Sequence, residues 1–148
     1  MTRAAATIDI AAGPAHVWSV LIDWEGQARW MADAQWVRVL TPQRQGPGVI
    51  IRARTDIVAR LRVDDDMIVT QWCELERIGV RHLGRIIRGS GAFELQPSGA
   101  GTRFTWWEEL ELPLGPVGAA AGRLLIAPYV SRIFRRSLAQ LKQVAEAR

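Results

Sequence analysis

Cysteine and histidine are scarce in this sequence, which contains one cysteine, Cys73, and two histidines, His16 and His82. A single cysteine excludes an intramolecular disulfide and a cysteine-based zinc site. Neither histidine, nor Cys73, has the companions that a metal site or a nucleophilic triad requires. We therefore expect no metal and no cofactor. Residues 1–10 contain no apolar segment of the kind that directs secretion, which favours a cytoplasmic location.

Lysine is almost absent, since Lys142 is the only one, and arginine supplies the other positive charges. Lys and Arg together number 19 against 15 Asp and Glu, which gives a formal net charge of +4. The arginines are spread along the chain, with no helix-turn-helix or zinc finger to place them in a nucleic-acid groove. We expect no nucleic-acid partner. A protein-interaction module whose Arg-rich sheet face meets an acidic partner is a third hypothesis, weaker than the two functions given at the end of this section.

The chain also lacks a long uninterrupted hydrophobic run. The nearest approach is residues 112–130, which carry one charge, Arg123. A segment of this length could cross a bilayer. It is interrupted by three prolines and three glycines, which favour turns and a buried helix start over a membrane span. We expect no stable membrane insertion.

The length of 148 residues fits one domain, residues 1–148, with a full hydrophobic core. Alternation with period 2 predicts strands, and apolar spacing with period 3.6 predicts helices. The predicted order is a strand at 7–11, helices at 14–22 and 25–31, strands at 36–40, 49–55, 67–76 and 79–88, a hairpin at 89–112 and a helix at 119–147. The path of residues 56–79 stays open. A run of strands followed by a long helix is typical of an α+β fold.

The C-terminal helix is predicted to present one apolar side to the sheet. Pro128 lies inside it and removes a backbone donor, so we expect a kink or a break there. The residues assigned to the apolar side are Leu124, Leu125, Pro128, Phe134, Leu138, Leu141 and Ala145.

Residues 89–112 form the most informative segment, two alternating strands around a Pro-Ser-Gly-Ala-Gly turn. In the second strand one carboxylate, Glu108, lies on the face that is otherwise apolar and should point inward. A tight turn at residues 98–99 places Gly91 opposite Trp106 and Gly89 opposite Glu108. A turn one residue later changes the partners but not the faces. The glycines leave room beside the carboxylate for another group.

A buried carboxylate is costly unless it is paired. Glu108 is therefore either a structural anchor, bonded to an arginine, a tryptophan N–H or backbone donors, or a polar contact to a ligand. His82 is predicted to point inward two strands away, which at roughly 4.8 Å per strand puts it about 10 Å from Glu108. At that separation the two would not bond directly but could hold one molecule between them. His82 is either a satisfied core histidine or a general base.

Aromatic residues are mostly tryptophan, seven of eleven. Trp18, Trp24 and Trp30 are predicted to fix the two short helices to the sheet. Trp72, Trp106 and Phe93, which lies on the inner face of the hairpin, are better placed to contact an aromatic or polyene ligand. Tyr129, next to Pro128, is predicted to bring a hydroxyl to the mouth of a cavity.

Several short patterns, spread over essentially the whole chain, resemble the START-like (SRPBCC) superfamily and particularly its polyketide cyclase/dehydrase branch. They are Ile8-x-Ile10, Pro14-x-x-Val17-Trp18-x-x-Leu21-x-Asp23, Gly46-x-Gly48, Gly89-x-Gly91-x-Phe93-x-Leu95, Gly99-x-Gly101-Thr102-x-Phe104-Thr105-Trp106 and Arg135-Arg136-Ser137-Leu138-x-x-Leu141-Lys142. One departure is Cys73 to Gly79, where members of the family often carry a proline-containing turn. The resemblance implies a helix-grip fold, in which a curved seven-stranded antiparallel sheet wraps around a long C-terminal helix, with two short helices after the first strand.

The resemblance also implies a cavity between sheet and helix, but no particular reaction. We expect the protein to bind or transport a hydrophobic small molecule, lipid-like or polyketide-like, as a monomer or homodimer. The residues expected to contact it are Trp72, His82, Phe93, Trp106, Glu108 and Tyr129. The alternative is a cofactor-independent polyketide cyclase or dehydratase, with Glu108 or His82 in acid/base roles. The small number of inward polar groups favours the carrier, and no catalytic residue is assigned.

Overall fold

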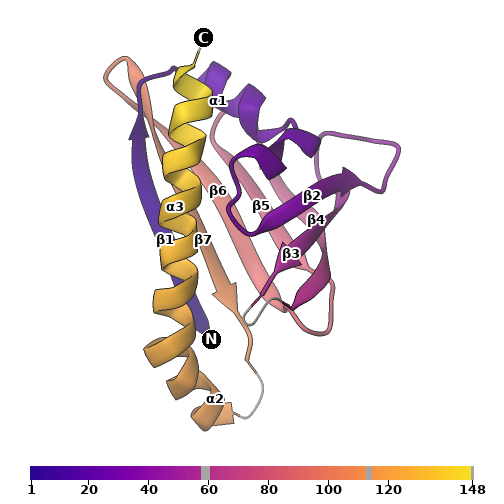
Figure 1. Ribbon diagram of the computed structural model, residues 1–148. Helices are drawn as coiled ribbons and strands as arrows, with labels where there is room; N and C mark the ends of the chain where they lie inside the picture. The colour runs from indigo at the N-terminus through magenta and orange to yellow at the C-terminus, as the bar shows by residue number, and fades with distance from the viewer. Residues whose placement is uncertain (58–60, 113–114, 148) are drawn as a thin grey trace.

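The computed structural model describes residues 1–57, 61–112 and 115–147. Residues 58–60, in the stretch whose path the sequence left open, and Pro113 lie outside the described residues. The described residues form a curled antiparallel sheet of seven strands in the order β1-β7-β6-β5-β4-β3-β2 (Figure 1). The strands are β1 (Thr2–Ile10), β2 (Ala34–Val39), β3 (Ile50–Asp56), β4 (Arg62–Cys73), β5 (Arg77–His82), β6 (Gly89–Ser98) and β7 (Gly101–Leu110).

Helices lie at one end and along one face of this sheet (Figure 1). They are α1 (Pro14–Leu21), the 3-10 helix η1 (Glu25–Arg29), α2 (Gly115–Ala121), the π-helix η3 (Gly122–Ile126) and α3 (Ala127–Glu146). The long helix α3 packs against β1, and α1 meets the C-terminal half of α3 at one end of the sheet. This is the helix-grip arrangement predicted from the sequence. No helix within the described parts of the chain is long and apolar enough to span a membrane.

The boundaries of several elements differ from the sequence prediction; β1, for example, begins at Thr2 rather than at residue 7, and two of the differences bear on the site. The first is β4, which begins at Arg62, because Asp64 and Asp66 continue the alternation by pairing with arginines of β3 on the outer face. The second is β5, which ends at His82 rather than near residue 88. Residues 83–88 form a loop, so the strand predicted over 79–88 is too long, and Ile86, which its alternation would put on the inward face with His82, is 71% exposed.

The C-terminal helix is continuous at Pro128, where a kink or break was expected. A π turn precedes the proline, and the N–H of Ala127 donates to the carbonyl of Gly122, five residues earlier. The wider turn accommodates a residue that has no N–H to donate. Leu124 and Leu125 are 76% and 69% exposed, so their assignment to the buried side is wrong. Their helical segment extends beyond the end of the sheet and has little to pack against (Figure 1).

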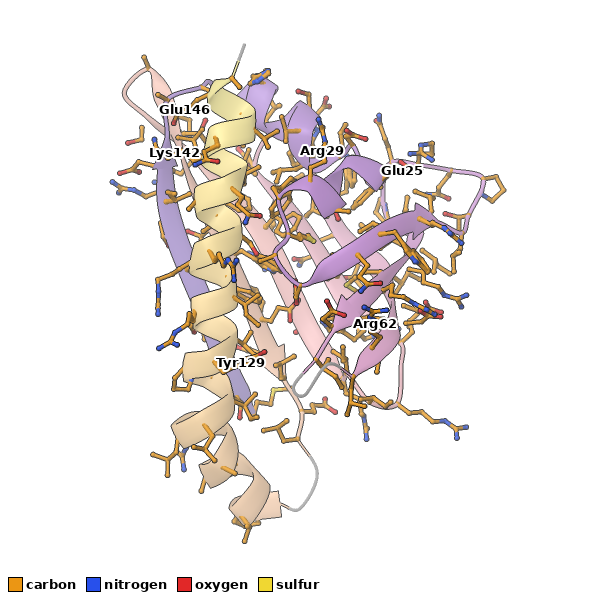
Figure 2. The ribbon with its side chains drawn as sticks, in the orientation of Figure 1. Glu25, Arg29, Arg62, Tyr129, Lys142 and Glu146 are labelled. Carbon is orange, nitrogen blue, oxygen red and sulfur yellow. The ribbon has the colours of Figure 1, made fainter. Side chains whose placement is uncertain are left out.

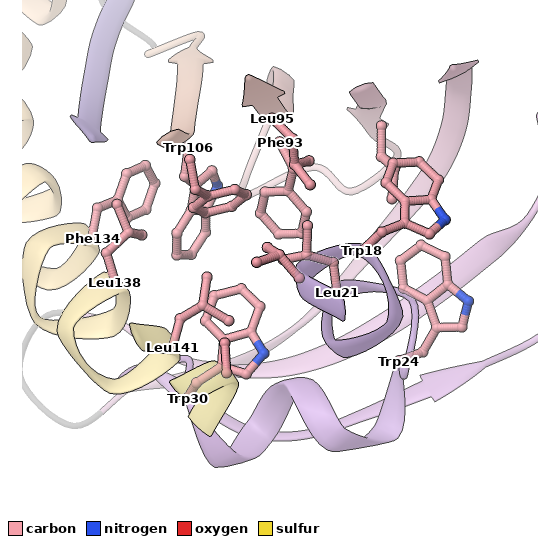
Figure 3. Close-up of a cluster of buried hydrophobic side chains, with 14 of the residues drawn as sticks. Trp18, Leu21, Trp24, Trp30, Phe93, Leu95, Trp106, Phe134, Leu138 and Leu141 are labelled. Carbon is pink, nitrogen blue, oxygen red and sulfur yellow. The ribbon is translucent and has the colours of Figure 1, made fainter. Parts of the chain in front are cut away.

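The core is built around aromatic side chains (Figure 3). Trp106 on β7 stacks on Phe134 of α3, with ring centroids 3.8 Å apart, and so joins the sheet to the helix. Trp18 on α1 meets Trp72 on β4 edge to face at 5.2 Å, and Trp30 packs against Phe93 at 5.8 Å. Aromatic pairs at these separations contribute beyond their buried area. The tryptophans near the two short helices therefore attach those helices to the sheet, as predicted.

Candidate functional site

A cavity of about 320 Å³ lies between the inner face of the sheet, η1 and α3. Its wall is mainly apolar. Trp106 and Phe93 form part of the sheet side, and Ile133 and Phe134 form part of the helix side. Tyr129, in the first turn of α3 (Figure 2), lines the cavity and is 44% exposed, which places it at the mouth. A volume of this order is at the lower end of what small-molecule sites in proteins use.

A polar cluster interrupts the apolar wall, and it consists of Asp33, Asp65, His82 and Glu108. Three carboxylates, Asp33, Asp65 and Glu108, line the cavity. His82 lies behind two of them with its side chain 1% exposed. Its Nδ1 is 2.8 Å from Oδ1 of Asp65, and its Nε2 is 3.4 Å from Oε1 of Glu108. The histidine therefore joins two acids on different strands.

The contact between His82 and Glu108 corrects the separation of about 10 Å expected from counting strands. The hairpin turns at residues 99–100, one residue later than the first expectation, so Gly91 lies opposite Glu108. A Cβ atom on Gly91 would be only 2.7 Å from Cγ of Glu108. The carboxylate therefore extends across β6 above a residue that has no side chain and reaches β5. A glycine leaves room beside Glu108, as predicted, but it is Gly91 rather than Gly89, and the group that enters this room is His82.

Asp65 reaches the same place from the other side. It lies on β4, where Asp64 and Asp66 point outward and bond to Arg54 and Arg52. Alternation then turns Asp65 inward, where it is 6% exposed. Sequence reasoning missed Asp65 because it began this strand at residue 67. The alternation of residues 64–66 was the signal that could have found it.

The pKa of His82 reflects both its burial and its partners. Burial alone would lower the pKa of the imidazole, but the bond to Asp65 and the nearby carboxylate of Glu108 raise it to about 10. His82 is therefore an imidazolium at neutral pH, and its Nδ1–H donates to Asp65. Burial raises the pKa of Asp65, while the bond to His82 opposes that rise.

Asp33 lies between η1 and β2, and none of the groups that change its pKa is a cation. Burial, together with the charges of Glu108, Asp65 and Asp56, raises the pKa of its carboxyl to about 6, against a backbone hydrogen bond that lowers it. Asp33 thus gains or loses a proton near neutral pH, which is the range in which general acids and bases work. Because its position after η1 shows no alternation, no pattern in the sequence indicated its role.

The six residues expected to contact a ligand are not all on the cavity wall. Phe93, Trp106, Glu108 and Tyr129 line it. His82 is buried and inward as predicted, but Asp65 and Glu108 separate it from the space. Trp72 does not line the cavity, because its ring packs between Trp18 and Trp24. Trp72 is thus part of the core, and Trp24 is the tryptophan from this group that reaches the wall.

The cluster does not have the geometry of a metal site. In residues 1–57, 61–112 and 115–147, no group of three or more His, Cys, Asp or Glu side chains could hold a metal ion. Both nitrogens of His82 are protonated and face carboxylates, so neither is available as a metal ligand. The arrangement can orient carboxylates, hold a positive charge behind them, and exchange a proton at Asp33.

Comparison with known proteins places this geometry in context. The family model described as "Polyketide cyclase / dehydrase and lipid transport" matches residues 1–146. None of the curated proteins compared with the chain has a matching sequence.

Solved structures match over nearly the full length. A protein from Thermus thermophilus has a TM-score of 0.82 at 20% identity, covering 98% of this chain and 97% of its own. The Zhui aromatase/cyclase from a Streptomyces species has 0.79 at 19% identity, covering 97% and 93%. A START superfamily protein from Mycobacterium smegmatis has 0.69 at 16% identity, covering 99% and 95%. At these identities the likeness establishes the fold.

Proposed function

The chain is a member of the polyketide cyclase/dehydrase and lipid transport family, and from that premise we propose that it binds a hydrophobic small molecule, lipid-like or polyketide-like, between the sheet and α3. The observation that supports this most is the cavity of about 320 Å³, whose wall is mainly apolar. Trp106 and Phe134 stack beside this space and can offer flat apolar surfaces to a ring or a polyene. Phe93, Trp106, Glu108 and Tyr129 are the proposed contacts.

Tryptophan fluorescence provides the test, because Trp106 and Trp24 line the cavity. The purified protein is analysed by native mass spectrometry for retained compounds and then titrated with apolar ligands. Binding should quench tryptophan emission saturably. Ala53 on β3 also lines the cavity and is 5% exposed, so Ala53→Phe should fill the space and weaken binding at least tenfold. No saturable binding to the native protein would contradict the proposal.

The matched control is Ala5→Phe, the same substitution on the exposed side of β1. It adds the same side chain outside the cavity, so affinity should equal that of the native protein. Equal affinities in Ala53→Phe and Ala5→Phe would show that the ligand binds elsewhere.

A second candidate function is a cofactor-independent cyclase or dehydratase. Four inward polar residues, more than the sequence had indicated, support it. Asp33 is the proposed acid/base group, because its pKa is raised to about 6 and its carboxyl lines the cavity. Incubation with a polyketide-like thioester, followed by mass spectrometry, should show loss of water with the native protein and not with Asp33→Asn. Turnover that is equal in both would remove Asp33 from this role.

We further propose that the protein acts in the cytoplasm, as a monomer or a homodimer. The family description, which names polyketide chemistry and lipid transport, supports binding of a small molecule rather than permanent residence in a bilayer. Light scattering after size-exclusion chromatography distinguishes the two oligomeric states, and cell fractionation tests the location.

A further inference from the structure

The charged residues around the cavity are mostly acidic. Five acidic residues line it, and Arg88 is the only lysine or arginine among the lining residues that the structure describes. Two of the acids have an arginine partner: Asp56 bonds Arg62 at 3.2 Å, and Glu111 lies 3.5 Å from Arg88. Of the other three, Asp65 and Glu108 share the imidazolium of His82, and no arginine or lysine among the described residues pairs with Asp33. With all three ionised, the polar cluster is left with two negative charges.

His82 is not available to a ligand. Its side chain is only 1% exposed, and its Nδ1–H donates a hydrogen bond to Asp65. Nε2 is buried without a well-formed hydrogen bond, because it faces Glu108 at 3.4 Å. Within the polar cluster, the polar atoms left to face the cavity are therefore carboxylate oxygens. An ionised carboxylate accepts hydrogen bonds and donates none.

We propose that the cavity selects an apolar molecule whose polar group donates hydrogen bonds and carries no negative charge, a hydroxyl or an amine, held by Glu108 and Asp33. The inference rests on the proposed binding function and narrows its ligand class. An anionic head group such as a fatty-acid carboxylate would meet two uncompensated negative charges there, and no side chain of the polar cluster would be free to donate a hydrogen bond to it. A donor head group would occupy acceptor positions that otherwise lack a partner.

Three ligands with the same alkyl chain test this directly: decanol, decylamine and decanoate, titrated into the native protein at pH 7.5 by tryptophan quenching and calorimetry. Decanol and decylamine should bind at least tenfold more tightly than decanoate. Decanoate binding as tightly as decanol would overturn the inference while leaving the binding function standing. Absence of binding by all three, and by other apolar ligands, would instead overturn the binding function and this inference with it.

Amide variants locate the selectivity. Glu108→Gln and Asp33→Asn keep the side-chain shape, remove a negative charge and add hydrogen-bond donors. Each should reduce the ratio of decanol or decylamine affinity to decanoate affinity at least threefold. The matched control is Glu109→Gln, on the outer face of the same strand, where Glu109 bonds Arg3. It should leave the preference unchanged. An unchanged preference in both inward variants, with circular dichroism showing folded protein, would contradict the assignment, as would an equal change in Glu109→Gln.

The pH dependence of binding separates the two kinds of donor. Asp33 faces Asp56 from β3, Asp65 from β4 and Glu108 from β7, with His82 on β5 behind the last two. Between pH 5 and pH 8 Asp33 loses its proton while His82 keeps its own, so the cluster becomes more negative. Decylamine should bind more tightly at pH 8, and decanol should change less. Decylamine affinity that falls over this range would contradict the inference, and Asp33→Asn should abolish the rise.

Discussion

At the scale of single residues, one histidine holds two carboxylates of different strands at the cavity wall. Asp65 and Glu108 lie 2.8 and 3.4 Å from the two nitrogens of His82. Removing one partner of a buried charged group costs more than the contact itself contributes, because the remaining charge is left without compensation. His82 thereby stabilises two acids that the fold places close together.

Substitution of His82 tests this role. His82→Ala should lower the free energy of unfolding at pH 7.5 by about 3–5 kcal/mol, because it leaves two inward carboxylates without a cation. Urea denaturation measures the change. His16→Ala is the control, since His16 is exposed on α1 and should have little effect. A loss below about 1 kcal/mol, the usual value for an exposed pair, would show that His82 does not hold the acids.

The stability contributed by His82 also depends on pH in a defined direction. Its folded-state pKa is raised from 6.5 to about 10, so its contribution is fully present below pH 6.5 and is lost as the pH rises through about 10.

Asp33 should give an unusual stability profile. Its folded-state pKa is raised from 3.8 to about 6, so the stability it contributes is present below pH 3.8 and is lost as the pH rises through about 6. Asp33→Asn should therefore stabilise the protein at pH 8, by roughly 1–2 kcal/mol, and have little effect at pH 4. Thermal unfolding at both pH values provides the measurement.

Asp64→Asn is the control with the opposite sign. Asp64 lies on the outer face of β4, and its bond to Arg54 lowers its pKa. The same substitution there should cost some stability at pH 8. If Asp33→Asn also destabilised the protein at pH 8, the ionised carboxylate of Asp33 would have to stabilise the folded state, and the predicted sign would be wrong.

At the scale of elements, the β6–β7 hairpin determines the geometry of the site. Its inner and outer faces follow from alternation and agree with the sequence prediction. The contact between Glu108 and His82 could not be predicted in the same way, because strand spacing measures backbones and the Glu108 side chain extends sideways over Gly91. Which side chains point inward depends on the residue pattern alone. The contact between Glu108 and His82 depends on the strand register, which changes when the hairpin turn moves by one residue.

Gly91→Ala tests the dependence of the site on this hairpin. The new Cβ would be 2.7 Å from Cγ of Glu108 and 2.9 Å from the carbonyl oxygen of Trp107, so the carboxylate must move away from His82. We expect a loss of about 1–3 kcal/mol in stability and weaker binding of decylamine. Gly84→Ala is the control, because its Cβ would make an ordinary contact of 3.6 Å. Equal effects of the two substitutions would refute a specific role for Gly91.

The C-terminal helix shows a second limit of prediction from sequence. Its core-facing residues Phe134, Leu138 and Leu141 are buried as expected. Leu124 and Leu125 are not, because helical periodicity does not report where the sheet ends and the π turn changes the phase ahead of Pro128. Apolar periodicity thus predicts which side of a helix is apolar, but not whether a partner covers it.

At the scale of the whole molecule, the described residues share one hydrophobic core. It contains side chains from the first strand, both short helices, the central strands and α3. The family and the helix-grip fold could be predicted from the sequence because several different short patterns typical of the family are spread along the whole chain. The charge distribution inside was not, since a net charge of +4 for the chain gives no hint of an acidic cavity.

A shared core leads us to propose that residues 1–148 fold as one domain. Unfolding in urea should then show one transition, with the same midpoint by tryptophan fluorescence and far-ultraviolet circular dichroism. Tryptophans on α1, η1 and β7 report the core, and circular dichroism reports all elements. Two separate midpoints would indicate that α3 or the strands β2 to β4 unfold independently.

The helix α3 follows every strand in the sequence, yet it supplies one wall of the cavity and packs against β1, the first strand. During synthesis, the sheet can therefore pair its strands before the surface opposite Trp106 exists. Until residues 127–134 have left the ribosome and docked, the aromatic sheet face is open to water and to chaperones. The proposed ligand can be enclosed only after this last helix has docked, so a growing chain should carry no ligand.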